Sequence, residues 1–474
     1  MLNDRARADA WRLSKRRFSR WTGAPFGVRI AAFLETADRM LLDGMPPVEA
    51  TGVLEEFQRL SRFEDGGEAA LFWDELVAAA GRMTERRRRL GQTRSLWGIT
   101  PIVGLKYGVE ADRKLGVDAM SMVFNTYHIS SDFDLNLKTL DQYVITEQNR
   151  LFYTFRRYVF AWALLNFDVF HFYNDCGILQ PQGGYGSDRF GINLTEMQTL
   201  KRAGKALFTY PYGADHRLRR RSLELDPLCF CTDCPEPGKF CLCDDVGGMQ
   251  MLEVIRQNAT RMLGFGLAMD LLPDARFLNF LVVDPDEVKP DAARAAAPQT
   301  ARSSRALRVG HFPNHDYFKG TRFLIAAIDE LRSEGREIEL VQFSGLGRDK
   351  VLSAMQDVDV VVDQLVSGAF GLTAVEAMAM ERPVIARLRP GVRISARDEC
   401  PVIEADPATI KGVLTGLLDD PGRLVGLGAR GRAYVLRHHS IDALAVGLAQ
   451  LYAEHLPPSH LASTRARCFG VGGV

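Results

Sequence analysis

The sequence lacks a net charge and a long uninterrupted apolar run. Its 59 Lys and Arg residues balance 59 Asp and Glu residues, so the formal net charge over 474 residues is +0. A chain without an overall field is not drawn as a whole to nucleic acid or to an anionic membrane, and we expect no nucleic-acid partner. The longest apolar stretch, Tyr158 to Tyr173, is interrupted by Asn166 and Asp168. It is also shorter than the ~20 residues of a membrane-spanning helix.

The sequence also lacks the pattern of a secretory signal. It opens with MLNDRARADAWRLSKRRF, which is charged throughout and has no apolar core. We therefore expect a cytoplasmic protein, and peripheral contact with the inner face of the plasma membrane is left open. The basic run Arg86–Arg89 could contact lipid headgroups or nucleic acid, but a solvated helix end is the simpler interpretation.

Cysteine is scarce outside one segment, LCFCTDCPEPGKFCLCDD, which holds five of the eight cysteines. Without a secretory signal, such clustering favours a metal site over disulfides. Two short-spaced pairs around a turn are typical of zinc held by four thiolates. The predicted ligands are Cys231, Cys234, Cys241 and Cys243, with Cys229 left over. Such a closed shell leaves no position for water, so the zinc would be structural. An iron–sulfur cluster and metal-free thiols are the alternatives.

What the sequence does contain is two stretches in which short apolar strands alternate with helices. This alternation predicts an α/β protein with two Rossmann-like, doubly wound domains. In such domains ligands bind at the carboxyl ends of the strands, so two facing domains enclose a cleft. The predicted divisions are a helical extension 1–92, a first domain 93–286 with a Cys-rich insertion 229–245, an Ala/Pro/Ser-rich linker 287–306, a second domain 307–440, and a final helix and tail 441–474.

Two segments of the second domain suit a diphosphate and a ribose. Lys319-Gly320 follows a predicted strand and opens a helix, which offers an ammonium group and free backbone N–H groups to phosphate. The small residues from Ser367 to Gly371 would let the backbone approach a ligand closely. Glu376 lies in the first turn of the next helix, where it could accept hydrogen bonds from a ribose. Thr373 and Glu376 also have the spacing of a capping box, which would give Glu376 a purely structural role.

These segments carry a family resemblance. The stretch from Arg308 to about Tyr452 resembles the C-terminal domain of retaining GT-B glycosyltransferases of group 1, or family 4. The likeness lies in HFPNHDYFKGTRFLIAAIDEL, VDVVVDQLVSGAFGLTAVEAMAMERPVIA and GRAYVLRHHSIDALAVGLAQLY. It implies that Lys319 binds the donor diphosphate and Glu376 the ribose, without a catalytic metal. The remaining residues that it implies at the donor site are Gly320, Phe370, Gly371, Leu372 and Thr373.

The sequence departs from the family pattern at two positions. The first Glu of the family's loop falls on Gly368, and the Arg that usually accompanies the Lys is replaced near His315 or Asp316. A missing cation would leave the diphosphate charge incompletely balanced. The candidates to supply it, in the loop after the next strand, are Arg387, Arg389 and Arg393.

The first domain offers two further candidate residues. Relatives place a His after the fourth strand near the reacting sugar, which implies His171 in DVFHFYND, although a packed core His fits its apolar neighbours equally well. Asp215, after the next strand, would face acceptor or sugar, or else cap a turn. The predicted function is transfer of a hexose from a nucleotide-diphosphate sugar to a glycan or lipid-linked glycan, in surface polysaccharide synthesis. A nucleotide-sugar epimerase and a non-catalytic scaffold are the alternatives.

Overall fold

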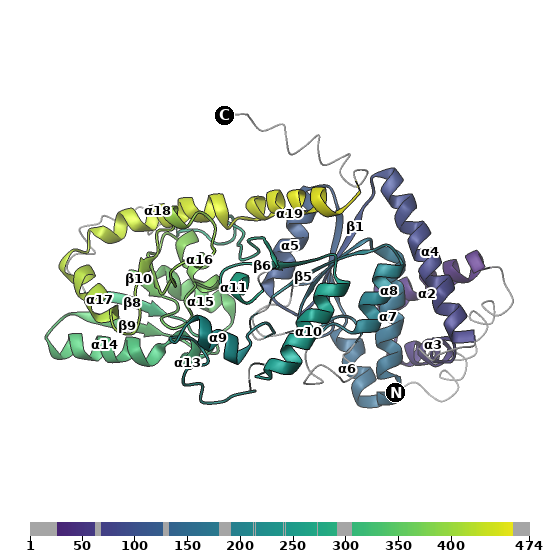
Figure 1. Ribbon diagram of the computed structural model, residues 1–474, viewed down its shortest axis with the longest axis horizontal. Coiled ribbons are helices and arrows are strands. Elements are labelled where there is room, and N and C mark those ends of the chain that lie inside the picture. The colour runs from purple at the N-terminus through teal and green to yellow at the C-terminus, as the bar shows by residue number, and fades with distance from the viewer. Residues whose placement is uncertain are drawn as a thin grey trace.

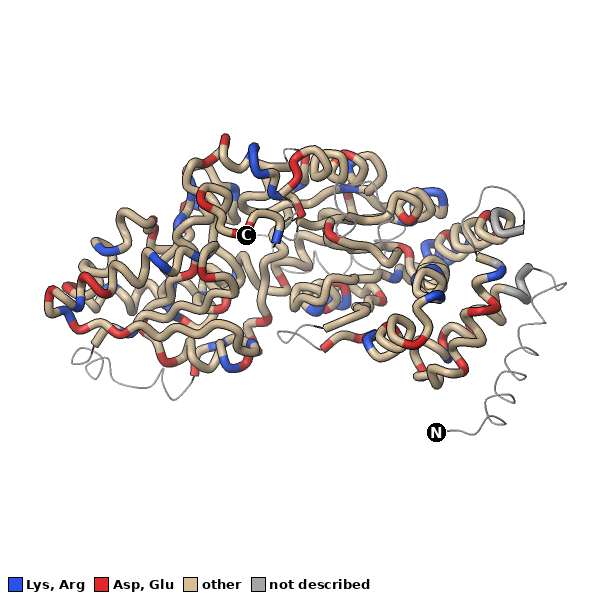
Figure 2. The backbone as a smooth tube through the Cα atoms, turned by 90° about the horizontal axis from the view of Figure 1, so that it is seen from below, with Lys and Arg blue, Asp and Glu red and all other residues tan. Residues whose placement is uncertain are grey.

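The computed structural model describes residues 26–61, 68–126, 132–179, 191–211, 213, 215–239, 241, 243–272, 274–291 and 306–457. The predicted ends of the chain and most of the predicted linker 287–306 lie outside these residues. Acidic and basic residues are interspersed along the described backbone, in keeping with the balanced composition (Figure 2). None of the helices described is both long and apolar enough to span a membrane.

Two parallel sheets, one in each domain, form the body of the molecule (Figure 1). The first has the order β3-β2-β1-β4-β5-β6-β7 and the second the order β12-β11-β10-β8-β9. The strands of the first sheet are β1 Arg94–Ile99, β2 Asp118–Val123, β3 Leu135–Asn136, β4 Val169–Tyr173, β5 Ala206–Tyr210, β6 Arg261–Gly264 and β7 Arg276–Phe277. Those of the second are β8 Leu307–His311, β9 Ile338–Gln342, β10 Val360–Val362, β11 Val384–Ala386 and β12 Ile403–Glu404. The two predicted α/β domains are thus present.

Helices cover both sheets. Those of the first domain are α5 Val103–Lys114, α6 Lys138–Glu147, α7 Phe152–Asn166, α8 Leu194–Arg202, α9 Arg219–Leu225, α10 Asp245–Asn258 and α11 Ala268–Leu271. Those of the second are α13 Asp316–Lys319, α14 Thr321–Ser333, α15 Arg348–Gln356, α16 Leu372–Ala379, α17 Ile410–Asp419 and α18 Arg423–His438. The central strands β4, β5 and β10 are buried along their whole length. Such burial on both faces is typical of parallel sheets and explains their continuous apolar sequences.

The N-terminal helices α2 Phe26–Leu41, α3 Pro47–Leu60 and α4 Glu68–Leu90 are part of the first domain's core. Phe33 and Phe57 each place their rings 5.0 Å from the ring of Tyr158 on α7. Trp162 of the same helix donates from Nε1 to Asp38 at 2.7 Å. The helical extension therefore covers α7 rather than forming a separate unit, which is in keeping with the burial of most residues of α7.

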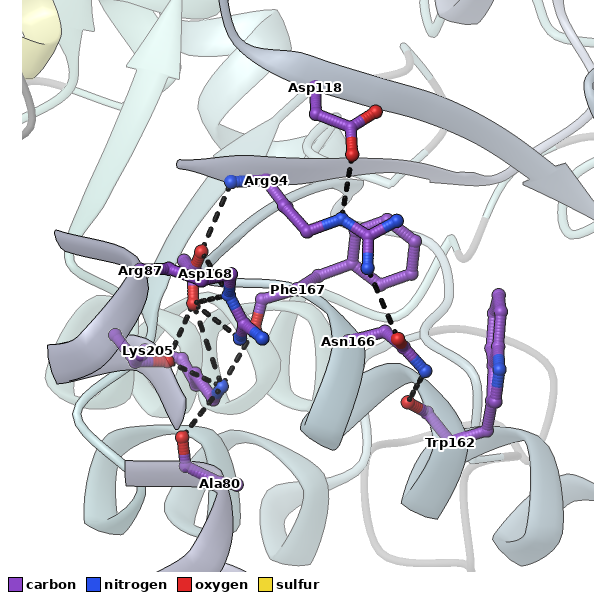
Figure 3. A network of polar contacts seen from close by, with 10 residues as sticks. Ala80, Arg87, Arg94, Asp118, Trp162, Asn166, Phe167, Asp168 and Lys205 are labelled. Carbon is purple, nitrogen blue, oxygen red and sulfur yellow. Dashed lines mark hydrogen bonds and ion pairs between the residues drawn. The ribbon is translucent and has the colours of Figure 1, made fainter. Parts of the chain in front are cut away.

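A buried polar network fastens α4 to the amino end of the sheet (Figure 3). The carboxylate of Asp168 accepts from Arg87 Nη2 at 2.7 Å and from Thr84 Oγ1 at 2.6 Å. Lys205 Nζ donates to Thr84 Oγ1 at 2.6 Å and to the carbonyl of Phe167 at 2.7 Å. Burial lowers the pKa of Lys205 to about 7. The sequence alone suggested that the basic run is solvated. Arg87, a member of that run, instead takes part in this buried network.

The last helix, α19 Ile441–His455, belongs to the first domain although it follows the second. Figure 1 shows α18 and α19 running one after the other from the second domain to the first. Leu444, Leu448 and Leu451 are buried in the same core as α5. Tyr452 Oη reaches Asp112 Oδ1 at 2.7 Å. The boundary predicted at residue 441 coincides with the first residue of α19.

The element predictions fail where local pattern conflicts with packing. The apolar spacing over 137–165 predicts a single helix, but the backbone at Gln148 is not helical (φ −136°, ψ 43°). The apolar run 266–269 predicts a strand, but it leads into α11, because Gly266 has φ +58° and residues 261–264 already form β6. The run 277–283 also predicts a strand, of which only Phe277 belongs to one, as the last residue of β7.

Candidate functional site

A cavity of about 330 Å³ lies between the two domains. Parallel strands of both domains end beside it, which is where doubly wound sheets place ligands. From the second domain it is lined by Gln364, Ser367, Ala369, Phe370, Gly371 and Arg389. From the first domain its wall includes Gly213, His216, Arg217, Asp226, Cys229, Phe265 and Asp270. The structure thus brings the predicted donor loop to an interdomain cavity.

Lys319 stands directly behind that loop and is held by Asp363. Its Nζ donates to Asp363 Oδ1 at 2.5 Å, and the other carboxylate oxygen accepts from the backbone N–H of Gly371 at 2.6 Å. A Cβ placed on Gly371 would lie 3.4 Å from Lys319 Nζ. Lys319 and Gly371 are therefore neighbours, as the resemblance implies. Both are bound to one buried carboxylate that the sequence-based assignment left without a role.

Glu376 forms a different contact from either of its predicted ones. It is buried on α16, and its Oε1 accepts from Arg348 Nε at 2.8 Å. Arg348 Nη2 also donates to Tyr107 of the first domain at 2.8 Å. Burial raises the pKa of Glu376, while the Arg348 guanidinium opposes that rise. The capping interpretation is wrong, because α16 begins at Leu372 after Gly371, without a side-chain cap.

The remaining donor-site residues divide into two groups. Phe370 lines the cavity together with Gly371. Leu372 and Thr373 form the first turn of α16 directly behind them. Gly320 has φ +76° and ends α13, and a Cβ there would meet Leu365 at 3.0 Å. Its glycine therefore permits close packing beneath the loop rather than open access to a ligand.

The geometry explains why residue 368 is not the family's glutamate. Gly368 has φ +77°, a region that side chains other than glycine rarely adopt. A Cβ there would lie 3.1 Å from Arg389 Cβ and 3.3 Å from Asp226 Oδ2. The space of a larger side chain is already filled by these neighbours. A glycine is thus required in this arrangement of the loop.

The three candidate cations of the second domain are all engaged. Arg387 donates to both oxygens of Asp226 at 2.8 and 2.9 Å. Arg389 forms an ion pair with Asp270. Arg393 places its guanidinium 5.9 Å from the ring centroid of Phe277. All three therefore contact residues of the first domain, and its carboxylates balance the charges of Arg387 and Arg389.

His171 is a core residue and does not line the cavity. It is 1% exposed on β4, and its ring is stacked on Trp97 with centroids 3.9 Å apart. Nδ1 and Nε2 are each 2.7 Å from a tyrosine hydroxyl, those of Tyr210 and Tyr452. Burial lowers its pKa well below the usual value. The structure favours the packed-core interpretation, and we assign His171 no catalytic role.

Asp215 lies close to the cavity but faces inward. Its Oδ1 accepts from the backbone N–H of Gly213 at 2.7 Å and lies 3.1 Å from His216 Nδ1. Gly213 and His216 line the cavity, whereas Asp215 is buried beneath them. The sequence analysis gave no role to Asp175, whose pKa burial raises to about 7 with a further contribution from Asp215. Its Oδ1 accepts from Thr100 Oγ1 at 2.7 Å.

The four predicted zinc ligands line one small cavity of about 20 Å³. Cys229 lies outside it and lines the interdomain cavity instead, as expected of the spare cysteine. Among the described residues, however, no three His, Cys, Asp or Glu side chains form a group that could hold a metal ion as placed. All five thiols of the segment are free of disulfides. The donor set suits zinc, but the zinc site is not shown.

The fold defines a class of protein. Two facing α/β domains with a C-terminal helix returned to the first domain form the GT-B fold of glycosyltransferases, and the predicted resemblance is confirmed at the level of the fold. No protein-family model matches the chain. Sucrose-phosphate synthase from Thermosynechococcus elongatus is similar with a TM-score of 0.50 and 13% identity, over 77% of this chain and 98% of that chain.

Two further proteins are similar to this chain, one over a short segment and the other over most of its length. D-inositol 3-phosphate glycosyltransferase of Mycolicibacterium vanbaalenii is 33% identical over 112 residues. That match spans 23% of this chain and 25% of the curated relative. The structure of HepE from Anabaena in complex with UDP-glucose has a TM-score of 0.48 and 13% identity, and the alignment covers 77% of this chain and all of that one.

Proposed function

We propose that the protein is a glycosyltransferase that transfers a hexose from a nucleotide-diphosphate sugar to a glycan or lipid-linked glycan. The observation that carries this proposal is the loop of residues 364–371, which lines an interdomain cavity and is backed by the Lys319 ammonium. The 33% identical segment of a curated glycosyltransferase supports it. Surface polysaccharide synthesis, a cytoplasmic location and peripheral contact with a membrane belong to the same proposal.

In this proposal the donor diphosphate binds near Gly371, where Lys319 and Asp363 meet. Lys319 offsets the charge that develops on the leaving diphosphate, which is electrostatic stabilisation of the transition state. Glu376 accepts hydrogen bonds from the ribose, with Arg348 orienting its carboxylate. Asp215 is proposed to act on the acceptor side through His216, which lines the cavity.

The proposed transfer retains the configuration of the sugar. The oxygen of an acceptor hydroxyl bonds to the anomeric carbon on the face from which the diphosphate leaves. The bond between that carbon and the diphosphate oxygen breaks, and the hydroxyl proton passes to the departing phosphate. The products are the glycoside and the nucleoside diphosphate. Since the departing phosphate takes the proton, the proposed step uses no separate base, and we propose it without a catalytic metal.

Calorimetry with UDP and GDP tests this proposal. We expect one of them to bind, and Lys319→Ala to weaken binding about tenfold or more, because a charge-assisted hydrogen bond contributes about 1.5–3 kcal/mol. Lys239→Ala, an exposed lysine, is the control. A wild-type protein that binds neither nucleotide would favour a scaffold. Conversion of the nucleotide-sugar without any acceptor would favour an epimerase.

We also propose that Cys231, Cys234, Cys241 and Cys243 hold a structural zinc ion. Their position around one small cavity supports this. Freshly prepared protein is expected to contain about one equivalent of zinc, and Cys234→Ser to lower this content while Cys400→Ser leaves it unchanged. Less than half an equivalent in the wild-type protein would contradict the proposal.

A further inference from the structure

The donor side of the cavity has a deficit of positive charge. A nucleoside diphosphate carries more than one negative charge, and Lys319 is already paired with Asp363, whose side chain is fully buried. Arg387 and Arg389 are paired with carboxylates of the first domain. The second domain by itself therefore does not balance the charge of the proposed donor.

Arg217 of the first domain is a cation on the opposite wall. Its guanidinium lies 4.8 Å from the ring centroid of Phe230 and 5.6 Å from that of Phe318. Phe318 belongs to α13 of the second domain, so rings from both domains fix the guanidinium by cation–π contact. Among the residues that the structure describes, none of the ion pairs recorded within 4.0 Å involves a carboxylate partner for Arg217.

Arg217 also contacts the neighbour in sequence of Lys319, the lysine proposed to bind the diphosphate. Phe318, which it contacts, is adjacent to Lys319 in the chain. The imidazole of His315 experiences both cations: burial lowers its pKa most, and the Arg217 and Lys319 charges lower it further. Lys319 lies behind Gly371, and Gly371 and Arg217 line the same cavity from different domains.

We propose that Arg217 binds the diphosphate of the donor across the cleft, in place of the arginine that the second domain lacks. This rests on the proposed function and adds a residue to its donor site. A planar guanidinium suits this role because it can donate two parallel hydrogen bonds to phosphate oxygens. Since the Arg217 contacts span both domains, the complete diphosphate site exists only when the domains are closed.

The adjacent cysteines offer a competing role for Arg217. It also lines the small cysteine cavity, and negative charge on Cys241 and Cys231 would raise its pKa against the effect of burial. In that role Arg217 would only balance the thiolates, and its loss would disturb the cysteine segment rather than nucleotide binding. The two roles differ in what a substitution changes.

The test measures binding of UDP, GDP and their nucleosides to the full-length protein, together with its zinc content. For the diphosphate that binds the wild type, we expect Arg217→Ala to raise the Kd tenfold or more, and Arg217→Lys to recover part of the loss. The affinity for the matching nucleoside should change less than twofold, because the nucleoside has no phosphate. Arg220→Ala, an exposed arginine on the same segment, should leave all affinities unchanged.

Three outcomes would overturn the inference. One is an unchanged Kd for the diphosphate in Arg217→Ala, with Lys319→Ala still impaired, and this leaves the proposed function standing. A second is an equal loss of nucleoside and diphosphate affinity. A third is lost zinc in both Arg217 variants, with the diphosphate affinity restored when zinc is supplied. Failure of the wild type to bind either diphosphate would instead remove the proposed function itself.

Discussion

At the scale of single residues, Gly368 carries two separable constraints, a positive φ and a crowded surrounding. Gly391 has a similar φ of +76°, but a Cβ there would meet no atom within 4 Å. Gly368→Ala is therefore expected to lower the free energy of unfolding more than Gly391→Ala, about 2 kcal/mol or more against about 1 kcal/mol. Chemical unfolding of both variants measures the difference. Equal losses would mean that the neighbours of residue 368 move aside freely.

The same scale shows what sequence reasoning could find at the site. Phe370 and Gly371 line the cavity and Lys319 lies next to Gly371, which is the neighbourhood that the motif predicts. The partners of the charged residues were not predicted, because they come from distant positions. Asp363 is 44 residues from Lys319, and Arg348 reaches Tyr107 across 241 residues. No local pattern encodes such pairings.

At the scale of elements, the segment after β4 places the carboxylate of Asp175 in a buried position, where its charged form is disfavoured. Burial raises the pKa of Asp175 from its ordinary value of 3.8 to about 7, with Asp215 adding to the rise. The folded protein therefore binds this proton more tightly than the unfolded chain does. The stabilisation is fully present below about pH 4 and is lost as pH rises through about 7.

Asp175→Asn removes this titration while keeping an oxygen that can accept from Thr100. We expect its melting temperature to fall less than that of the wild type between pH 5 and pH 8. Asp442→Asn, at an exposed position on α19, is the control and should follow the wild type. A variant whose pH dependence matches the wild type would show that Asp175 is not the group responsible.

Element prediction succeeded where burial and pattern agree. The second domain shows the predicted alternation of strands and helices, and α19 begins at residue 441, where the final helix was predicted to begin. The loop between β5 and α10 was less predictable, because its residues are placed by contacts with the other domain, such as Arg387 with Asp226. His171 shows that a position assigned to the site by the resemblance can belong to the core instead. Its Nε2 bonds to the hydroxyl of Tyr452, which lies 281 residues further along the chain.

At the scale of the whole molecule, α19 makes the first domain depend on the end of the chain. Tyr452 Oη lies 2.7 Å from both His171 Nε2 and Asp112 Oδ1, all three being buried. Tyr452→Phe removes the partner of Asp112 Oδ1 and of His171 Nε2, and it is expected to cost about 2–3 kcal/mol of unfolding free energy. Tyr153→Phe, at a half-exposed tyrosine on α7, should cost far less in the same urea titration. Similar losses would argue against the buried network.

The return of α19 also means that the chain passes between the domains twice. The first passage follows Val283 and the second lies at His439, and the backbone N–H of Val283 donates to the His439 carbonyl at 2.9 Å. This bond joins the two connections side by side. Twisting one domain against the other would break it, whereas bending about the line of the two connections would leave it intact. If the proposed nucleotide binds in the cavity, we expect it to leave along a single direction of opening, away from these two connections.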